Sequence, residues 1–281
     1  MISLIQNNPF LKNIPLVRRF IFTYLKNWLQ SHPKDELVTS IIKNIKMNLS
    51  VNDWVQQNLF LYGFYEKNET DYWLKRTLNA TTVIDIGANV GYYSLLAAKN
   101  VSQNNGKVYA FEPVSKTFNR LNENISLNKF KNIETFKKAI SNQHNTIQIN
   151  VGNDENWGMS SINQHEHLSG ETEQVIAETL DSFCDENSIT AIDLIKIDVE
   201  GAEFNVLQGM TAVLEKHKPE VLIEILDQHL NKQNVSSKDV FNFFWSKGYQ
   251  AFQIIENGEL NQISEAKSYA GLICFKYSKS L

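Results

Sequence analysis

Residues 83–91 read VIDIGANVG, an apolar run that leads directly into a turn with two glycines. The run predicts a buried strand over 82–86, and the residues after it predict the start of a helix over 91–98. In open α/β sheets, ligands bind at the carboxyl ends of such strands. We therefore expect a ligand at this turn. Gly87 would let the ligand approach the backbone, and Gly91 would let the helix pack tightly on the strand.

Apolar runs of the same kind alternate with helical stretches from residue 81 onward. This alternation is typical of right-handed βαβ units and predicts an α/β fold with a doubly wound, mostly parallel sheet. Two late apolar runs are expected to close the sheet, the last of them in antiparallel pairing. The predicted strands are 107–111, 133–136, 194–197, 221–225, 251–255 and 272–276, and the predicted helices are 115–127, 202–214 and 238–245.

Two other nucleotide sites share this strand–turn–helix plan, and the glycine spacing argues against both. The dinucleotide fingerprint G-x-G-x-x-G, counted from Gly87, needs glycines where Asn89 and Tyr92 stand. A P-loop needs a G-K-[ST] sequence, which does not follow the turn. Asp85 would repel a pyrophosphate but attract a cationic amino group, such as that of the methionine part of S-adenosylmethionine.

A second acidic residue follows the next predicted strand, in the sequence KVYAFEP at 107–113. A carboxylate in the place of Glu112 can accept hydrogen bonds from both hydroxyls of a ribose. Because NAD sites use the same contact, Glu112 alone indicates adenosine and not which cofactor carries it. Asp85 and the turn together favour S-adenosylmethionine as that cofactor. The alternative for Glu112 is that it is only a solvated acid at the end of a strand.

The third motif is IDLIKIDVEGAE at 192–203, again a strand, a turn and a helix. Side chains alternate along a strand, so Lys196 and Asp198 share one face. We expect Asp198 to be the catalytic base or a metal ligand, with Glu200 as the second choice and Lys196 as a charge partner. A purely structural ion pair of Lys196 with Asp198 or Glu224 is the alternative.

Together these motifs resemble the FkbM family of S-adenosylmethionine-dependent methyltransferases. The resemblance covers roughly 60–226 and includes DIGANVGYYS at 85–94, AFEP at 110–113, Asn128, IKIDVEGAE at 195–203 and GFYE at 63–66. It implies a class I methyltransferase fold with a seven-stranded sheet, and O-methylation of a hydroxyl on a sugar, glycan or natural product. The residues expected to bind S-adenosylmethionine are Asp85, Gly87, Asn89, Gly91, Glu112 and Pro113.

Two other functions stay open at this stage. An NAD-dependent reductase would use the same fold, but the missing glycine at Asn89 argues against it. A non-catalytic methyltransferase-like binding module would not need the intact acidic motifs. The acceptor itself is not encoded in the fold or in the cofactor motifs.

The segment between the third strand and the strand at 194–197 is long for one crossover, and we interpret about 146–178 as an insertion with extra strands at 146–151 and 173–176. Its polar part, 153–170, is expected to cover the acceptor. Trp157 could stack on a sugar or ring, and His165 or His167 could act as a base, although a solvated histidine is the commoner case.

The N-terminal region differs in character from the rest of the chain. We expect residues 1–80 to form a helical cap, with Asn52 capping one helix, and 81–281 to form the methyltransferase domain. Residues 1 to about 45 are expected to be a helical appendage outside the central sheet. The amphipathic segment 16–29 could contact a membrane surface or, more simply, its own domain or a partner subunit.

The composition of the 281-residue chain is that of an ordinary globular protein, with a net charge of −4 and no basic stripe. Nucleic acid is therefore not expected as a partner. The family resemblance implies a small-molecule or glycan acceptor, and assembly of identical copies stays open. The sequence shows neither a signal peptide nor a long apolar span. Its two cysteines, Cys184 and Cys274, have no metal-ligand spacing, which fits a reducing cytoplasm.

Overall fold

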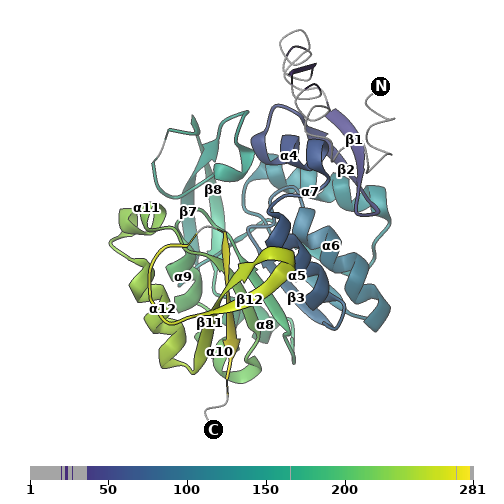
Figure 1. Cartoon of the computed structure of the whole chain (residues 1–281). Helices are drawn as coiled ribbons and strands as arrows, with labels where there is room; N and C mark the ends of the chain where they lie inside the picture. The colour runs from purple at the N-terminus through teal and green to yellow at the C-terminus, as the bar shows by residue number, and fades with distance from the viewer. Residues whose placement is uncertain are drawn as a thin grey trace.

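A central sheet of eight strands organises the chain, which was studied as a computed structural model (Figure 1). The structure describes residues 37–278 except 165 and 270, together with residues 20, 23, 24 and 27. The strand order is β12-β11-β13-β10-β9-β3-β4-β5. The strands are β3 (Thr82–Ile86), β4 (Lys107–Phe111), β5 (Ile133–Phe136), β9 (Leu194–Ile197), β10 (Glu220–Glu224), β11 (Tyr249–Ile255), β12 (Glu259–Ile263) and β13 (Leu272–Tyr277).

The predicted doubly wound sheet is confirmed, with one strand more than expected. Strands β5, β4, β3, β9 and β10 are parallel to one another, and β13 pairs antiparallel with both β10 and β11. The eighth strand, β12, pairs with β11 at the edge of the sheet. The prediction missed it because its sequence, ELNQI, is mostly polar and exposed at this edge.

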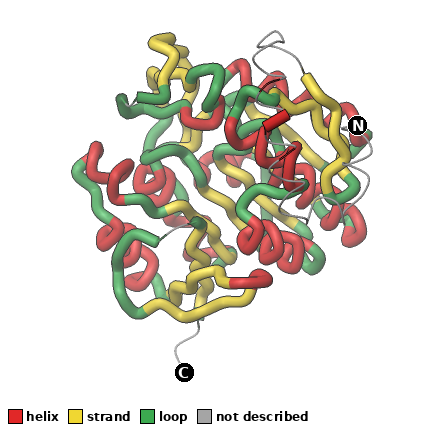
Figure 2. Tube along the Cα trace, turned by 45° about the horizontal axis from the view of Figure 1, so that its top comes forward, coloured by secondary structure: helices red, strands yellow, loops and turns green. Residues whose placement is uncertain are grey.

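The two faces of the sheet are covered by different helices, as the alternation of side chains along each strand requires (Figure 2). Ile84 and Ile195 face a core formed with α8, α9, α10 and α12. Val83 and Leu194 face a second core formed with α4, α5 and α6. The helices are α4 (Trp54–Tyr62), α5 (Lys67–Thr77), α6 (Tyr92–Val101), α7 (Ser115–Asn128), α8 (Leu180–Glu186), α9 (Glu203–Gln208), α10 (Thr211–His217), α11 (Asp227–Leu230) and α12 (Ser237–Ser246).

The single helix predicted over 202–214 is interrupted in the structure. It ends as α9 at Gln208 and resumes as α10 at Thr211. A Cβ on Gly209 would lie 1.9 Å from the backbone oxygen of Ser141, so only glycine allows this approach of the two segments. The break is therefore a tertiary effect that helical periodicity does not reveal.

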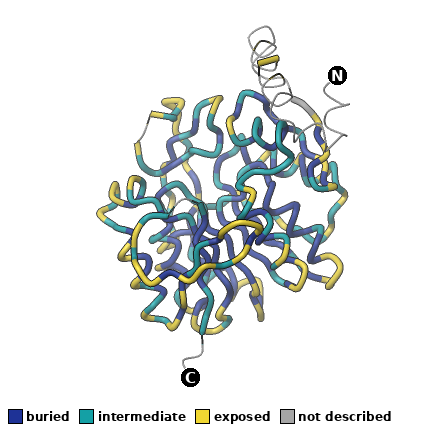
Figure 3. Tube along the Cα trace, viewed as in Figure 1, coloured by how far each residue is buried: buried dark blue, intermediate teal, exposed yellow. Residues whose placement is uncertain are grey.

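The chain reverses its direction of strand addition between β3 and β9. It builds β3, β4 and β5 outward and then crosses back to place β9 on the other side of β3. Loops leaving the carboxyl ends of β3 and β9 therefore diverge, and the crevice between them is where ligands bind in such sheets. In Figure 3 the residues coloured as buried gather in the centre of the molecule.

The expected insertion forms a separate three-stranded sheet of order β6-β8-β7. Its strands are β6 (Ala139–Ile140), β7 (Asn145–Gly152) and β8 (Leu168–Glu178). The two extra strands predicted at 146–151 and 173–176 are thus confirmed and are longer than expected. A short 3-10 turn at Trp157–Met159 lies between β7 and β8.

The N-terminal region is not helical throughout, which corrects the expectation. Residues 37–50 form an antiparallel hairpin of β1 (Leu37–Ile42) and β2 (Ile45–Ser50), outside the central sheet. Asn128 of α7 binds both the backbone N–H and the backbone oxygen of Lys46, which fixes the hairpin to the domain. Most of the segment 16–29 lies outside the described residues, and its contact with a membrane stays a prediction.

Candidate functional site

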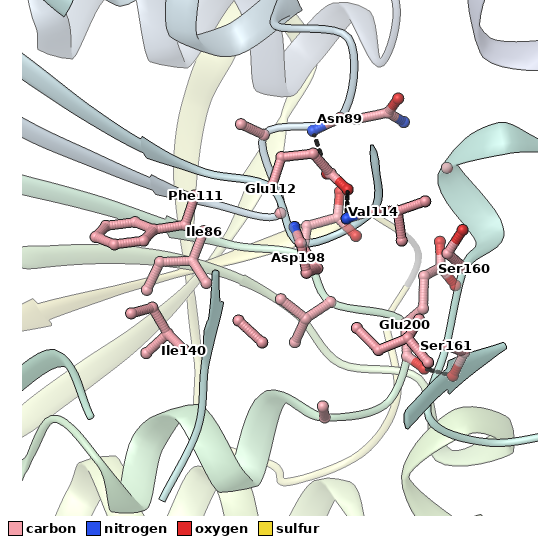
Figure 4. Close-up of a pocket in the computed structure, with 18 of the residues that line it drawn as sticks. Ile86, Asn89, Phe111, Glu112, Val114, Ile140, Ser160, Ser161, Asp198 and Glu200 are labelled. Carbon is pink, nitrogen blue, oxygen red and sulfur yellow. Dashed lines mark hydrogen bonds between the residues drawn. The ribbon is translucent and has the colours of Figure 1, made fainter. Parts of the chain in front are cut away.

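A cavity of about 300 Å³ opens at the carboxyl ends of β3, β4 and β9 (Figure 4). Residues from the insertion and from the N-terminal helices complete its wall. The predicted residues on the wall are Asp85, Gly87, Asn89, Glu112, Pro113, Lys196, Asp198 and Glu200. The structure therefore brings together side chains that the sequence placed on three separate strands.

The two glycines of the first turn each allow a close approach within the protein that was not predicted from the sequence. Gly87 has a φ of +82°, and a Cβ there would lie 1.8 Å from the backbone oxygen of Asp198. Gly91 has a φ of +93°, and a Cβ there would lie 2.6 Å from a methyl group of Leu121. The first glycine therefore admits the neighbouring β9 turn, and the second lets α6 pack on α7 rather than on the strand. Gly87 also lines the cavity, and the approach of a ligand to it stays a prediction.

Glu112 is buried at the end of β4 and is held by the two turns beside it. Its carboxylate accepts hydrogen bonds from the backbone N–H of Asn89 at 2.9 Å, from the backbone N–H of Val114 at 3.0 Å and from the hydroxyl of Thr117 at 2.7 Å. Figure 4 shows the two backbone contacts. Burial raises the pKa of Glu112 despite these contacts. The alternative of a solvated strand-end acid is thereby excluded.

Asp85 is completely buried, and it faces the same side of the sheet as Lys196. One carboxylate oxygen accepts a hydrogen bond from Ser94 at 2.5 Å, whereas the other, Oδ1, is buried without a hydrogen-bond partner among the described residues. Burial raises the pKa of Asp85, and the nearby Lys196 partly opposes this rise. An unsatisfied buried acceptor beside a cavity is suited to a ligand that brings a donor.

Lys196 and Asp198 form an ion pair at the end of β9, with 2.9 Å between the ammonium nitrogen and the carboxylate. Lys196 lies opposite Asp85 in the sheet register, and its ammonium group is 5.0 Å from the ring centre of Tyr93. Burial alone would lower the pKa of Lys196, but the carboxylates of Asp198 and Asp85 outweigh it and raise the pKa. The structure thus contains the predicted Lys196–Asp198 pair.

Three further acidic residues lie close to this pair. Burial, and then the charge of Asp198, raise the pKa of both Glu200 and Glu224 well above the usual value. Burial raises the pKa of Glu66 to about 7, and Asp198 adds to the effect. The ends of β9 and β10 therefore carry more carboxylates than the single buried lysine can neutralise. The sequence analysis had not selected Glu66, although it lies in the GFYE motif.

Glu203 has a different position from its neighbours in the motif. Its carboxylate accepts hydrogen bonds from the backbone N–H groups of Val199 and Gly201, so it holds the turn before α9. Burial raises its pKa to about 7. This arrangement agrees with an acid in the first turn of a helix, where the helix dipole favours it.

The insertion reaches the cavity, and its aromatic residue Trp157 is largely buried there. Trp157 lines the wall with only 9% of its surface exposed, and the ammonium group of Lys116 lies 4.0 Å from the centre of its ring. Trp54, at the start of α4, is 57% exposed, lines the same cavity and contacts Tyr65 edge-on. The accessible aromatic side chain is therefore Trp54.

Neither histidine of the insertion is shown to reach the site. His165 lies outside the described residues, and His167 is 43% exposed in its side chain and is not on the cavity wall. A third histidine, His229 in α11, lies 3.5 Å from Glu200 and 3.9 Å from Glu224. His229 was not predicted as a site residue, although it comes only four residues after the end of a predicted strand.

Comparison with known proteins now identifies the family. The methyltransferase FkbM domain matches residues 85–251, more than half of the chain. The chain belongs to the FkbM methyltransferase family. The predicted resemblance and the class I methyltransferase fold are thereby confirmed, and the sheet of this FkbM methyltransferase adds β12 to the seven strands expected.

Curated relatives of this FkbM methyltransferase are distant. The chain is 29% identical to the 2-O-methyltransferase NoeI of Sinorhizobium fredii, over 53% of this chain and 64% of that protein. It is 27% identical to Methyltransferase 1 of Beauveria bassiana, over 46% of this chain and 57% of that protein. The matches therefore span about three fifths of the length of these relatives.

Solved structures of related proteins include a methyltransferase FkbM from Methylobacillus flagellatus. It aligns with a TM-score of 0.47 and 16% identity, and the alignment covers 78% of this chain and 52% of that chain. Among the residues that the structure describes, no helix has the length and apolar character needed to cross a bilayer. Both cysteines are buried and unpaired.

Proposed function

We propose that this FkbM methyltransferase transfers a methyl group from S-adenosylmethionine to a hydroxyl group of a sugar, glycan or other natural product, in the cytoplasm. The observation that carries the proposal is the cavity itself, where Asp85 and Glu112 face the Lys196–Asp198 pair. One relative is named a 2-O-methyltransferase, which supports an oxygen as the accepting atom.

The residues at the ends of β3 and β4 fit S-adenosylmethionine, and we refer to Asp85, Asn89 and Glu112 as the cofactor half. The unsatisfied Oδ1 of Asp85 would receive a hydrogen bond from an ammonium group. The carboxylate of Glu112 has lone pairs left for ribose hydroxyls beyond its three protein donors. Gly87, Gly91 and Pro113 would shape the turns around the ligand. When bound, the sulfonium supplies an activated methyl group.

A second group of residues on the cavity wall is named the acceptor half and consists of Trp54, Asp198, Glu200 and Glu224. An alcohol has a high pKa, so it must lose its proton as the methyl group arrives, and a base within hydrogen-bond reach is the simplest means. Asp198 is our choice for this base. Lys196 would hold its carboxylate in position, and Glu200 is the second choice for the base.

Trp54 supports a ring-shaped acceptor. An exposed indole on the wall of a cavity offers an apolar face to the C–H groups of a sugar or to an aromatic ring. The edge-on contact with Tyr65, with ring centres 5.9 Å apart, restrains the indole beside the carboxylates. Carboxylates next to such a face can accept hydrogen bonds from the hydroxyl groups of the acceptor.

The proposal is tested by calorimetric titration of the purified chain with S-adenosylhomocysteine and, separately, with NADH. We expect binding of S-adenosylhomocysteine at one site and none of NADH, because the turn lacks the dinucleotide glycines. The reverse result would support a reductase. Binding of S-adenosylhomocysteine without methyl transfer to any of a panel of pyranosides and phenolic alcohols would support a binding module instead.

A further inference from the structure

Three potential metal ligands from separate elements meet at the edge of the acceptor half. Glu200 stands in the turn after β9, Glu224 ends β10, and His229 lies in α11. One ligand atom from each lies within 4.8 Å of the other two. The three residues are not neighbours in the sequence. The order of the strands in the sheet and the placement of α11 bring them together.

The distances within the cluster suit ligands of one ion better than direct hydrogen bonds. The Nδ1 atom of His229 lies 3.5 Å from a carboxylate oxygen of Glu200 and 3.9 Å from one of Glu224. N–H···O hydrogen bonds are about 2.7–3.2 Å long. Ligand bonds of about 2.1 Å to one ion place neighbouring ligand atoms about 3.0–3.5 Å apart, so a small side-chain movement would complete the site.

The backbone around the cluster is fixed by contacts that bring α11 close to the β9 turn. A Cβ on Gly201 would lie 3.1 Å from the backbone oxygen of His229, so a larger residue would crowd the two segments. The side chain of Gln233 donates a hydrogen bond to the backbone oxygen of Gly201, and Asn205 donates one to Gln233. The imidazole is therefore held beside the carboxylates rather than on a free surface.

The carboxylates of the cluster are not neutralised by a neighbouring lysine or arginine among the described residues. Lys196, the buried lysine beside it, is already paired with Asp198. Among the described residues, no lysine or arginine forms an ion pair with Glu200 or Glu224. When both carboxylates are ionised, they carry a charge of −2 beside a neutral imidazole, which a divalent cation would balance. This mixed oxygen and nitrogen set suits Mn²⁺, Fe²⁺ or Zn²⁺.

We propose that Glu200, Glu224 and His229 bind a divalent transition-metal ion at the acceptor side of the cavity. Glu200 and Glu224 both line the cavity, so coordination positions left open by the three ligands would face the acceptor. A metal ion there lowers the pKa of a coordinated hydroxyl group, and Asp198 would then receive the proton more readily. This use of the ion rests on the proposed methyl transfer to a hydroxyl, whereas the binding site does not.

Electron paramagnetic resonance of Mn²⁺ tests the site without turnover. The full chain is freed of metal with chelator and titrated with Mn²⁺, and the signal of free Mn²⁺ reports how much is bound. We expect one bound ion per chain, displaced by Zn²⁺. Glu224→Gln and His229→Gln should each weaken binding by tenfold or more, because each removes one of three ligands. Glu166→Gln, at an exposed carboxylate, is the matched control and should bind as the native chain does.

Measurements of folding and of cofactor binding distinguish loss of the metal site from loss of the fold or of the proposed function. Each variant is checked by its melting temperature in chelator, and Glu200→Gln replaces Glu224→Gln if the latter fails to fold. The metal site would be overturned if the folded native chain bound neither Mn²⁺ nor Zn²⁺, or if all variants bound the ion equally. An ion pair of His229 with the two carboxylates would then explain the cluster. Calorimetry with S-adenosylhomocysteine on the same samples tests the proposed function independently.

Discussion

The cofactor half and the acceptor half share one cavity but are assembled in different ways. In the cofactor half, Asp85 binds Ser94, nine residues later in the chain, and Glu112 binds Val114 and Thr117 of the turn and helix that follow it. In the acceptor half, contacts join distant segments, because His229 of α11 lies 3.5 Å from Glu200. Next to Trp54, the backbone N–H of Trp157 donates a hydrogen bond to Asp53.

This difference in assembly explains why one half is recognisable in a single sequence and the other is not. A strand, a glycine turn and a helix form one local unit, and its acidic residues come with it. The acceptor half needs α4, the insertion and three strand ends to meet. Asp53 connects two of these parts, because it caps α4 through Gln56 and also binds Trp157. We therefore expect substitutions in the two halves to act on different steps.

The largest effect should come from Gly87→Ala, at the point where the two halves touch. The new Cβ would lie 1.8 Å from the backbone oxygen of Asp198, and the positive φ adds strain. We expect a loss of more than about 4 kcal/mol in the free energy of unfolding, measured by urea denaturation. Gly170→Ala is the control, because Gly170 has a φ of +86° but no atom near its Cβ position. It should cost only about 1–2 kcal/mol, and equal losses would contradict the role of the close approach.

The next effect depends on pH and concerns Glu66, whose charge interacts with that of Asp198 in the acceptor half. The pKa of Glu66 is raised from 4.5 to about 7 by burial. Folding therefore favours its protonated form, and this contribution to stability is full below pH 4.5 and is lost as pH rises through 7. Glu66→Gln keeps the neutral form, so its stability relative to the native chain should rise across that window by at most about 3 kcal/mol. Urea denaturation in chelator at pH 4.5, 6 and 8 measures this, and parallel curves would show that Glu66 does not titrate there.

Asp198→Asn should separate chemistry from cofactor binding. The amide keeps the shape of the side chain but cannot take the proton of the acceptor. We expect kcat for methyl transfer to fall by about 10²-fold or more, with the affinity for S-adenosylhomocysteine nearly unchanged. Near-normal turnover on an accepted substrate would make Asp198 a structural partner of Lys196.

Glu112→Ala should instead weaken the binding of the cofactor. It removes the carboxylate that would bind the ribose, and a charge-assisted contact of this kind contributes about 1.5–3 kcal/mol. We expect the affinity for S-adenosylhomocysteine to fall about tenfold or more by calorimetry. Glu123→Ala, in a half-exposed ion pair on α7, is the control and should bind normally. Equal affinities of the two variants would remove Glu112 from the cofactor site.

The smallest effect is expected for Trp54→Ala. Loss of an aromatic face that stacks on the acceptor costs about 0.5–1.5 kcal/mol beyond the lost area. KM for an accepted sugar or aromatic alcohol should rise several-fold, while the affinity for S-adenosylhomocysteine stays constant. Trp54→Phe should restore most of the affinity, because it keeps an aromatic face. An unchanged KM in Trp54→Ala would place the acceptor elsewhere on the wall.

The sequence by itself determined the strand–turn–helix units and the acids attached to them. The runs at 82–86, 107–111 and 194–197 became β3, β4 and β9 with the same bounds. Apolar runs and glycine turns determine local structure because their physical requirements, burial and positive φ, are met within a few residues. The resemblance to the FkbM family depended on these same local motifs.

Only the tertiary structure decided what surrounds those units. Gly87 faces the Asp198 backbone, Trp54 rather than Trp157 is the accessible ring, and His229 joins Glu200 and Glu224. Such contacts depend on the sheet register and on how distant segments pack. Hydrophobic periodicity records that a side chain is buried, but not which neighbour it meets, because burial is non-directional.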